Sequence, residues 1–124
     1  MIPYDLLIVD DSNAIRKILQ RVIHTAEIPL RNVYEAADGL EALAVLKANN
    51  VSLVVSDINM PNMDGLQLLT QIRANEAWKN VPVIMITTEG SQAKVIEAAQ
   101  LGANGYVRKP FTPEQIKNAL SALV

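Results

Sequence analysis

Residues 6–11 read Leu6-Leu7-Ile8-Val9-Asp10-Asp11, an aliphatic run that ends on two carboxylates. Three later runs likewise end on a residue that suits a phosphate group or a divalent cation: Leu53-Val54-Val55-Ser56 before Asp57, Val83-Ile84-Met85-Ile86 before Thr87, and Tyr106-Val107-Arg108 before Lys109. Short, continuous β-branched and aliphatic runs, separated by segments of helical periodicity, are typical of buried parallel strands. The pattern therefore predicts a parallel α/β sheet whose strand ends carry polar groups.

The polar residues at the strand ends are expected to meet in one pocket. Parallel strands share one carboxyl edge, and ligands of open α/β sheets bind in the crevice outside that edge. Asp10, Asp11 and Asp57 would then be close neighbours. Two carboxylates about 4 Å apart repel by roughly 4 kcal/mol at an effective dielectric constant of about 20, so the cluster requires a cation. This donor set predicts Mg²⁺, and Lys109 can add a second positive charge.

The whole sequence alternates strand and helix five times, which predicts one doubly wound α/β domain over residues 1–124. Strands are predicted near residues 5–9, 32–36, 52–56, 82–86 and 104–107. The first helix has an apolar stripe of Ile15, Ile18, Leu19, Val22 and Ala26, and the second has one of Leu40, Leu43 and Leu46. Helix starts are indicated by Asp38 with Glu41 in capping-box position, by Asp64-Gly65, by Ser91 and by Pro113.

The composition of the 124-residue chain excludes several classes of protein. With 50% hydrophobic and 19% charged residues it can fill a core, which a disordered segment cannot do. A net charge of −2 argues against a binder of duplex nucleic acid. The chain has no cysteine, no signal-peptide pattern and no apolar stretch near the roughly 20 residues that span a bilayer. We therefore expect a cytoplasmic protein that binds neither nucleic acid nor membrane.

Four motifs resemble the receiver domain of two-component response regulators, in the same order and over the whole chain. They are Asp10-Asp11-Ser12, Ser56-Asp57-Ile58-Asn59-Met60-Pro61-Asn62-Met63-Asp64-Gly65, Thr87-Thr88-Glu89, and Gly105-Tyr106-Val107-Arg108-Lys109-Pro110-Phe111. The resemblance is strongest to the single-domain, CheY-like chemotaxis members of that family. It implies a flavodoxin-like (βα)5 fold with five parallel strands in the order 2-1-3-4-5, which is the order that CheY itself has.

The resemblance also implies a phosphorylation mechanism at Asp57. This residue would accept a phosphoryl group from a phosphohistidine of a sensor histidine kinase. Asp11, Asp57 and the backbone carbonyl of Asn59 would hold Mg²⁺, for which Mn²⁺ could substitute, and Asp10 would act largely through water. Lys109 and the metal would neutralise charge on the transferred group. The chain would catalyse only its own phosphorylation and autodephosphorylation, so we do not expect an enzyme that turns over an outside substrate.

Further residues of the family pattern concern the conformational switch and the lifetime of the phosphoryl group. In the family, Thr87 moves toward the phosphoryl oxygen and the ring of Tyr106 swings into the vacated space. Lys109-Pro110 resembles the family's cis peptide, which is otherwise a minority state of such bonds. The lifetime would be tuned by three residues that flank the path of the attacking water: Asn59, Thr88 and Glu89.

The expected partners follow from the same resemblance. The histidine kinase is the phosphodonor, and an output protein, with the flagellar motor switch as one candidate, would bind the face made by the fourth helix, the fifth strand and the fifth helix. A phosphatase is a further candidate, and we expect a monomer. Asn59 and Glu89 are the pair that CheY carries, which favours chemotaxis or motility. Arg16, Lys17 and Arg21 form a basic stripe that is either a solvated helix face or a docking surface for an acidic partner.

Four alternatives stay open on the sequence alone. The chain could be a receiver of another phosphorelay, or one excised from a larger transcription regulator. A haloacid-dehalogenase-type phosphatase also uses an Asp nucleophile, Mg²⁺ and a Lys on a parallel sheet, but that family places its acidic motif on the first strand and is generally longer. A flavodoxin-like nucleotide binder would need backbone N–H groups and hydroxyls where Asp10-Asp11 stands.

Overall fold

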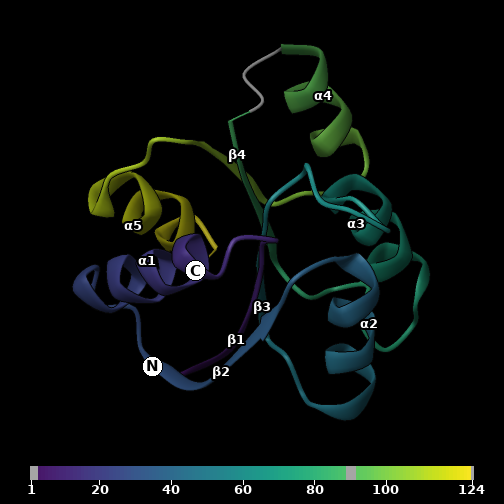
Figure 1. Cartoon of the computed structure of the whole chain (residues 1–124), viewed down its shortest axis with the longest axis horizontal. Coiled ribbons are helices and arrows are strands. Elements are labelled where there is room, and N and C mark those ends of the chain that lie inside the picture. Colours follow the sequence, from purple (N-terminus) through teal and green to yellow (C-terminus); the bar gives the residue numbers. More distant parts are fainter. Residues whose placement is uncertain (1–2, 89–91, 124) are drawn as a thin grey trace.

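The computed structural model describes residues 3–88 and 92–123 of the chain. These residues form a parallel sheet with helices on both faces (Figure 1). The strands are β1 (Tyr4–Val9), β2 (Leu30–Ala36), β3 (Leu53–Ser56), β4 (Val83–Thr87) and β5 (Gly105–Arg108), in the order β2-β1-β3-β4-β5. The helices are α1 (Asn13–Thr25), α2 (Gly39–Ala48), α3 (Gly65–Ala74), α4 (Gln92–Gln100) and α5 (Pro113–Ser121). The predicted flavodoxin-like fold and strand order are confirmed. Within the described ranges, no helix is both long and apolar enough to pass through a bilayer.

Two apolar layers cover the sheet, one on each face. Helices α1 and α5 lie on one face, and α2, α3 and α4 lie on the other (Figure 1). Successive residues of β1 alternate between the layers, because Leu7 and Val9 pack with α2 and α3 while Leu6 and Ile8 pack with α1 and α5. All four side chains are fully buried. Since both faces are covered, the central strands are aliphatic at nearly every position, which explains the continuous apolar runs in the sequence.

Two predicted apolar stripes are partly wrong. Leu40, expected to face the core from the second helix, is 54% exposed, and Ile18 of the first helix is 43% exposed. In α2, Gly39 faces inward and lies so close to Met63 that a Cβ atom at position 39 would be 2.5 Å from Met63 Cγ. This close packing turns the neighbouring Leu40 outward. In α1, Leu19 occupies the buried face, and Ile18 lies at its margin.

Capping side chains set the helix starts. The Asp38 side chain accepts a hydrogen bond from the N–H of Glu41 (2.9 Å), but the Glu41 carboxylate accepts from the N–H of the residue before Asp38, so the expected reciprocal box is not formed. Helix α3 begins after Asp64, which forms a complete capping box, and α5 begins at Pro113. Ser91, predicted to cap the fourth helix, lies outside the described residues.

Asp5 joins the first two strands near the start of β1. Its buried carboxylate accepts hydrogen bonds from Arg31 Nη2 (2.5 Å) and Arg31 Nε (3.0 Å), and from Asn32 Nδ2 (2.9 Å). The hydrogen bonds from Arg31 are the main cause that lowers the pKa of Asp5 from 3.8 to about 2, against the opposing effect of burial. The folded chain therefore binds a proton at Asp5 less readily than the unfolded chain does.

This pairing should stabilise the fold in a pH-dependent way. Because the folded-state pKa of Asp5 lies below the ordinary value, its contribution is complete above pH 3.8 and is lost as the pH falls toward about 2. The difference in free energy of unfolding between wild type and Asp5→Asn, from urea titrations at a series of pH values, should be largest near neutral pH and shrink across that window. A difference that does not change with pH would contradict the expectation.

Candidate functional site

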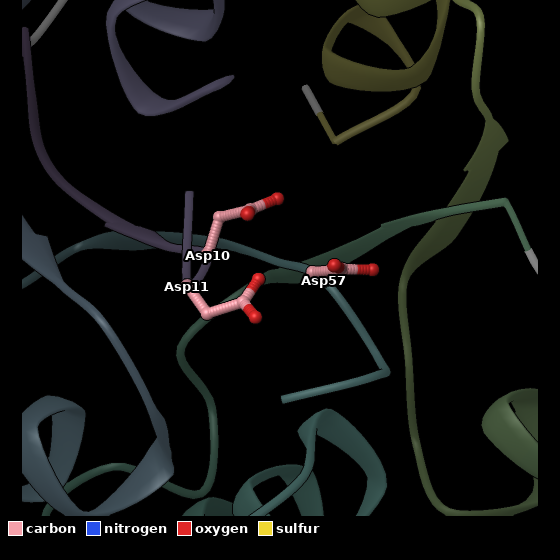
Figure 2. Close-up of side chains that lie close together, drawn as sticks. All are labelled: Asp10, Asp11 and Asp57. Atoms are coloured by element: carbon pink, nitrogen blue, oxygen red, sulfur yellow. The ribbon is translucent and has the colours of Figure 1, made fainter. Parts of the chain in front are cut away.

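Asp10, Asp11 and Asp57 lie together at the carboxyl edge of the sheet (Figure 2). Strands β1 and β3 are neighbours, paired in register through Val9 and Ser56, so the residues that follow each strand emerge side by side. One carboxylate oxygen from each aspartate lies within 4.8 Å of those from the other two. Asp10 is 1% and Asp57 is 8% exposed, whereas Asp11 faces solvent. The predicted acidic cluster is present.

Lys109 brings a positive charge to this cluster from the end of β5. Its Nζ atom donates hydrogen bonds to Asp10 Oδ2 (2.8 Å) and Asp57 Oδ2 (3.3 Å). The backbone N–H of Lys109 donates to the carbonyl of Thr87 (2.8 Å), which ties the end of β5 to β4. The Lys109–Pro110 peptide bond is cis. The ammonium therefore bridges two carboxylates that belong to different strands.

Burial and charge act in opposite directions on the pKa values of this site. Burial raises the pKa of Asp57; the charge of Lys109 offsets part of this shift, and the charge of Asp10 adds to it. Burial lowers the pKa of Lys109, but the hydrogen bond to Asp10 and the charge of Asp57 outweigh it, so the pKa of Lys109 lies above its usual value. Lys109 is therefore charged at neutral pH, and a further cation would relieve the repulsion that remains among three carboxylates.

Backbone hydrogen bonds orient two of the carboxylates. Asp10 Oδ1 accepts from the N–H of Ser12 (2.9 Å), and Asp57 Oδ1 accepts from the N–H of Ile58 (2.8 Å). Each carboxylate thus keeps one oxygen on the backbone and turns the other toward Lys109. The cluster offers only hard oxygen donors, the kind that Mg²⁺ and Mn²⁺ bind. The donor set therefore fits the metal that the sequence predicts.

The loop between β3 and α3 carries Asn59 and is held from two sides. The N–H of Gly65 donates to the carbonyl of Ile58 (2.8 Å), which closes the loop against α3. Asn62 adopts a left-handed backbone conformation (φ 65°), and its side-chain amide donates to Asp38 Oδ2 (2.7 Å) at the start of α2. Asn59 itself is exposed near the beginning of this loop. These contacts hold the loop in place next to the cluster.

The predicted switch residues lie on the two strands beyond β3. Thr87 is fully buried at the end of β4, and Tyr106 is half-buried on the neighbouring strand β5. Thr88 follows β4 and is exposed, whereas Glu89 lies outside the described residues. The structure therefore brings Thr87 to the same sheet edge as Asp57 and places Tyr106 one strand further out.

Two of the three residues of the predicted basic stripe form ion pairs within the molecule. Arg16 Nε and Lys17 Nζ both pair with Glu35 of β2, at 3.0 and 2.8 Å, and Arg16 Nη1 donates to the carbonyl of Asp10 (2.6 Å). Arg16 is therefore neither a solvated side chain nor a cation that is free to bind a partner. Sequence reasoning missed this contact with the site. The available signal was a cation in the first turn of a helix, where the helix dipole disfavours it unless acceptors lie nearby.

Comparison with known proteins identifies the family. The chain matches the family "Response regulator receiver domain" over residues 6–121. It is 45% identical over 118 residues to chemotaxis protein CheY-3 of Vibrio cholerae, which covers 95% of this chain and 89% of the relative. It is 42% identical over 120 residues to chemotaxis protein CheY1 of Helicobacter pylori, which covers 96% and 95%.

Solved structures show the same similarity. Chemotaxis response regulator CheY4 of Vibrio cholerae superposes with a TM-score of 0.87 at 35% identity, covering 99% of this chain and 100% of the other. A chain of the CheX-CheY-BeF3-Mg²⁺ complex from Borrelia burgdorferi superposes with a TM-score of 0.89 at 33% identity, covering 99% and 91%. The alternative functions are not better supported than this one. The chain belongs to the response regulator receiver domain family and is a phospho-accepting two-component regulator that resembles the CheY chemotaxis proteins.

Proposed function

We propose that Asp57 is the residue that accepts the phosphoryl group, with a phosphohistidine of a sensor histidine kinase as the donor. The observation that carries this assignment is the contact of the Asp57 carboxylate with Lys109 (3.3 Å), within a cluster completed by Asp10 and Asp11. A nucleophile for phosphoryl transfer needs nearby positive charge more than it needs covalent assistance. Among the three carboxylates, Asp57 combines contact with the ammonium and partial access from outside.

The transfer is a displacement at phosphorus. A carboxylate oxygen of Asp57 forms the new O–P bond as the N–P bond to the donor imidazole breaks, and the electron pair of that bond stays on the imidazole nitrogen. The N–H of Ile58 holds Asp57 Oδ1 during the attack, and Lys109 neutralises charge on the transferred oxygens. Because Lys109 already contacts Asp57, little rearrangement is needed when the phosphoryl group arrives.

Asp11, Asp57 and the backbone carbonyl of Asn59 would hold Mg²⁺, with Asp10 acting through water, and Mn²⁺ would bind the same oxygen donors. When bound, the metal supplies positive charge that offsets carboxylate repulsion and polarises the phosphoryl oxygens. Asp11 is exposed, and its carboxylate has no hydrogen bond among the described residues, so it can reach a hydrated ion without giving one up there. The complex with BeF3 and Mg²⁺ formed by a similar CheY supports this assignment.

Phosphorylation would act through Thr87 and Tyr106 on a surface formed by α4, β5 and α5. Thr87 is buried next to the cluster, and Tyr106 lies on the adjacent strand, so a small movement at one can be passed to the other. Val95 and Ile96 of α4 are exposed apolar residues on the neighbouring helix. We propose that this surface binds the output protein, such as the flagellar motor switch, or a phosphatase; that CheY of Borrelia burgdorferi forms a complex with CheX supports the binding of a partner protein.

We place the chain, as a single receiver domain and a cytoplasmic monomer, in chemotaxis or motility signalling, on the basis of its similarity to CheY-3 and CheY1. Asn59, Thr88 and Glu89 would set how long the phosphoryl group persists. The chain would catalyse its own phosphorylation and dephosphorylation only. Release of many equivalents of phosphate from a small ester would instead indicate a phosphatase.

The assignment of Asp57 is tested by intact-mass measurement after incubation with phosphoramidate. Wild type should gain one phosphoryl group in the presence of Mg²⁺ and none when the metal is removed by EDTA. Asp57→Asn, which keeps the size of the side chain but removes the nucleophilic carboxylate, should gain none under either condition. An adduct on folded Asp57→Asn, or no adduct on folded wild type, would overturn the assignment.

A further inference from the structure

Arg16 lies in the first turn of α1, an unfavourable place for a cation. The N-terminus of a helix carries a partial positive charge, so an arginine there costs free energy unless local acceptors compensate. Its side chain is only 14% exposed and donates to three acceptors: the carbonyl of Asp10 (Nη1, 2.6 Å), Glu35 Oε1 (Nε, 3.0 Å) and Asn13 Oδ1 (Nη2, 3.2 Å). The first two of these contacts hold the guanidinium against the acidic cluster and against the neighbouring strand β2, and the third lies within α1 itself.

The contact with the carbonyl of Asp10 controls the peptide that joins Asp10 to Asp11. A peptide bond is planar, so holding its oxygen holds the plane that contains the N and Cα atoms of Asp11, the point from which the Asp11 side chain leaves. The side chain of Asp10 is already held by Ser12 and Lys109. Among the described residues, the carboxylate of Asp11 accepts no hydrogen bond, so its direction depends on its backbone. Arg16 holds this backbone through its hydrogen bond to the Asp10 carbonyl.

Glu35 anchors Arg16 from the neighbouring strand. In the sheet, Glu35 of β2 pairs in register with Ile8 of β1, two residues before Asp10. The pKa of Glu35 lies below its usual value, and the hydrogen bond from Lys17 is the main cause. Burial opposes this shift, and the hydrogen bond from Arg16 lowers the pKa further. Glu35 is therefore charged at neutral pH. A charged carboxylate on a rigid strand therefore holds the guanidinium in place. Lys17 shares this anchor but has no hydrogen bond to the Asp10 carbonyl.

We propose that Arg16 is a positioning residue that aims the Asp11 carboxylate at Asp10 and Asp57 and thereby raises the affinity of the site for Mg²⁺. This inference rests on the proposed function of the cluster as the metal site. Groups that orient metal ligands typically change metal affinity by about 10- to 100-fold when they are removed. Geometry and charge make opposite predictions here, because the positive charge of Arg16 by itself would repel a cation.

The opposite signs allow a decisive set of variants. Arg16→Lys keeps the charge, but an ammonium on a flexible stem cannot serve the Asp10 carbonyl and Glu35 as a planar guanidinium does. Lys17→Gln removes a positive charge at the next position and one hydrogen bond to Glu35. It leaves the hydrogen bond from Arg16 to the Asp10 carbonyl unchanged. Glu35→Gln leaves Arg16 in place but weakens its anchor, and it serves as the second route if Arg16→Lys fails to fold.

Isothermal titration of the unphosphorylated proteins with MgCl₂ provides the test, with melting temperatures in EDTA to confirm folding. We expect Arg16→Lys to raise the Kd for Mg²⁺ by about tenfold, Glu35→Gln to raise it less, and Lys17→Gln to leave it within about twofold of wild type. In an Asp11→Asn background, Arg16→Lys should have no further effect, because the ligand that it aims is gone.

Two outcomes would overturn the positioning role. If folded Arg16→Lys binds Mg²⁺ as tightly as wild type, the geometry of the guanidinium does not contribute to the affinity for Mg²⁺. An equal loss of affinity from Arg16→Lys with and without Asp11 would show that Arg16 does not act through that carboxylate. Wild type that binds no Mg²⁺ at all would instead overturn the proposed function of the cluster, and the two failures are therefore distinguishable.

Discussion

Lys109→Met is expected to slow phosphorylation of Asp57 by a small phosphodonor by about 10²- to 10³-fold, the usual cost of removing one preorganised charge-stabilising donor. Among the residues that the structure describes, the Lys109 ammonium is the cation that contacts Asp57, at 3.3 Å, and it also contacts Asp10 at 2.8 Å. Methionine fills a similar volume but supplies no charge to the transferred phosphoryl group. The rate of appearance of the phosphorylated mass at a fixed concentration of phosphoramidate gives the comparison.

The same variant should separate catalysis from metal binding. Removing the ammonium leaves the cluster more negative, so the affinity for Mg²⁺ should not fall, whereas the phosphorylation rate should. Lys109→Arg keeps a cation in a different shape and should recover part of the rate. Lys109→Met that is phosphorylated at the wild-type rate would show that the ammonium is a structural ion pair without a part in the transfer.

Gly65→Ala should be the most damaging single methyl group that can be added near the site. A Cβ atom at position 65 would lie 2.1 Å from the backbone oxygen of Asp57 and 2.8 Å from Met85 Cε. A backbone carbonyl cannot rotate away as a side-chain end can. We expect a loss of about 3 kcal/mol in the free energy of unfolding, at the upper end of the cost of overpacking. Because Asp57 itself must move, phosphorylation of the folded fraction should also slow by about 10²-fold.

Gly105→Ala is the matched control for that substitution. A Cβ atom there would meet Ile84 Cδ1 at 2.8 Å, which is the free end of a side chain, and no backbone atom is among its close neighbours. The expected loss of stability is below about 1 kcal/mol, with little change in phosphorylation rate. Urea denaturation and intact-mass kinetics on both variants provide the comparison. Equal effects at positions 65 and 105 would show that contact with the Asp57 backbone is not the reason for glycine at position 65.

Much of this site could be predicted because it is made of strand ends. Asp10, Asp57 and Lys109 are far apart in the sequence, but Asp10 and Asp57 directly follow buried strands, Lys109 follows the partly buried strand β5, and parallel strands place their carboxyl ends on one edge. Their meeting therefore required only the type and direction of the strands. The contacts of Arg16 with Asp10 and of Asn62 with Asp38 could not be predicted in this way, since neither pair lies at two strand ends.

Local patterns in the chain were sufficient for the fold class, the family and the residues of the acidic cluster, because continuous apolar runs, the helical period of 3.6 and the order of motifs survive any small change in packing. Three features were determined by tertiary packing alone. They are the exposure of Leu40 on α2, the ion pair of Arg16 with Glu35, and the hydrogen bond from Arg16 to the carbonyl of the Asp10–Asp11 peptide. Each of these depends on contact distances between different elements of the fold, and such contacts change when a distance changes by a few tenths of an ångström. Such distances are set by close packing, as of Gly39 against Met63, and no one-dimensional pattern records them.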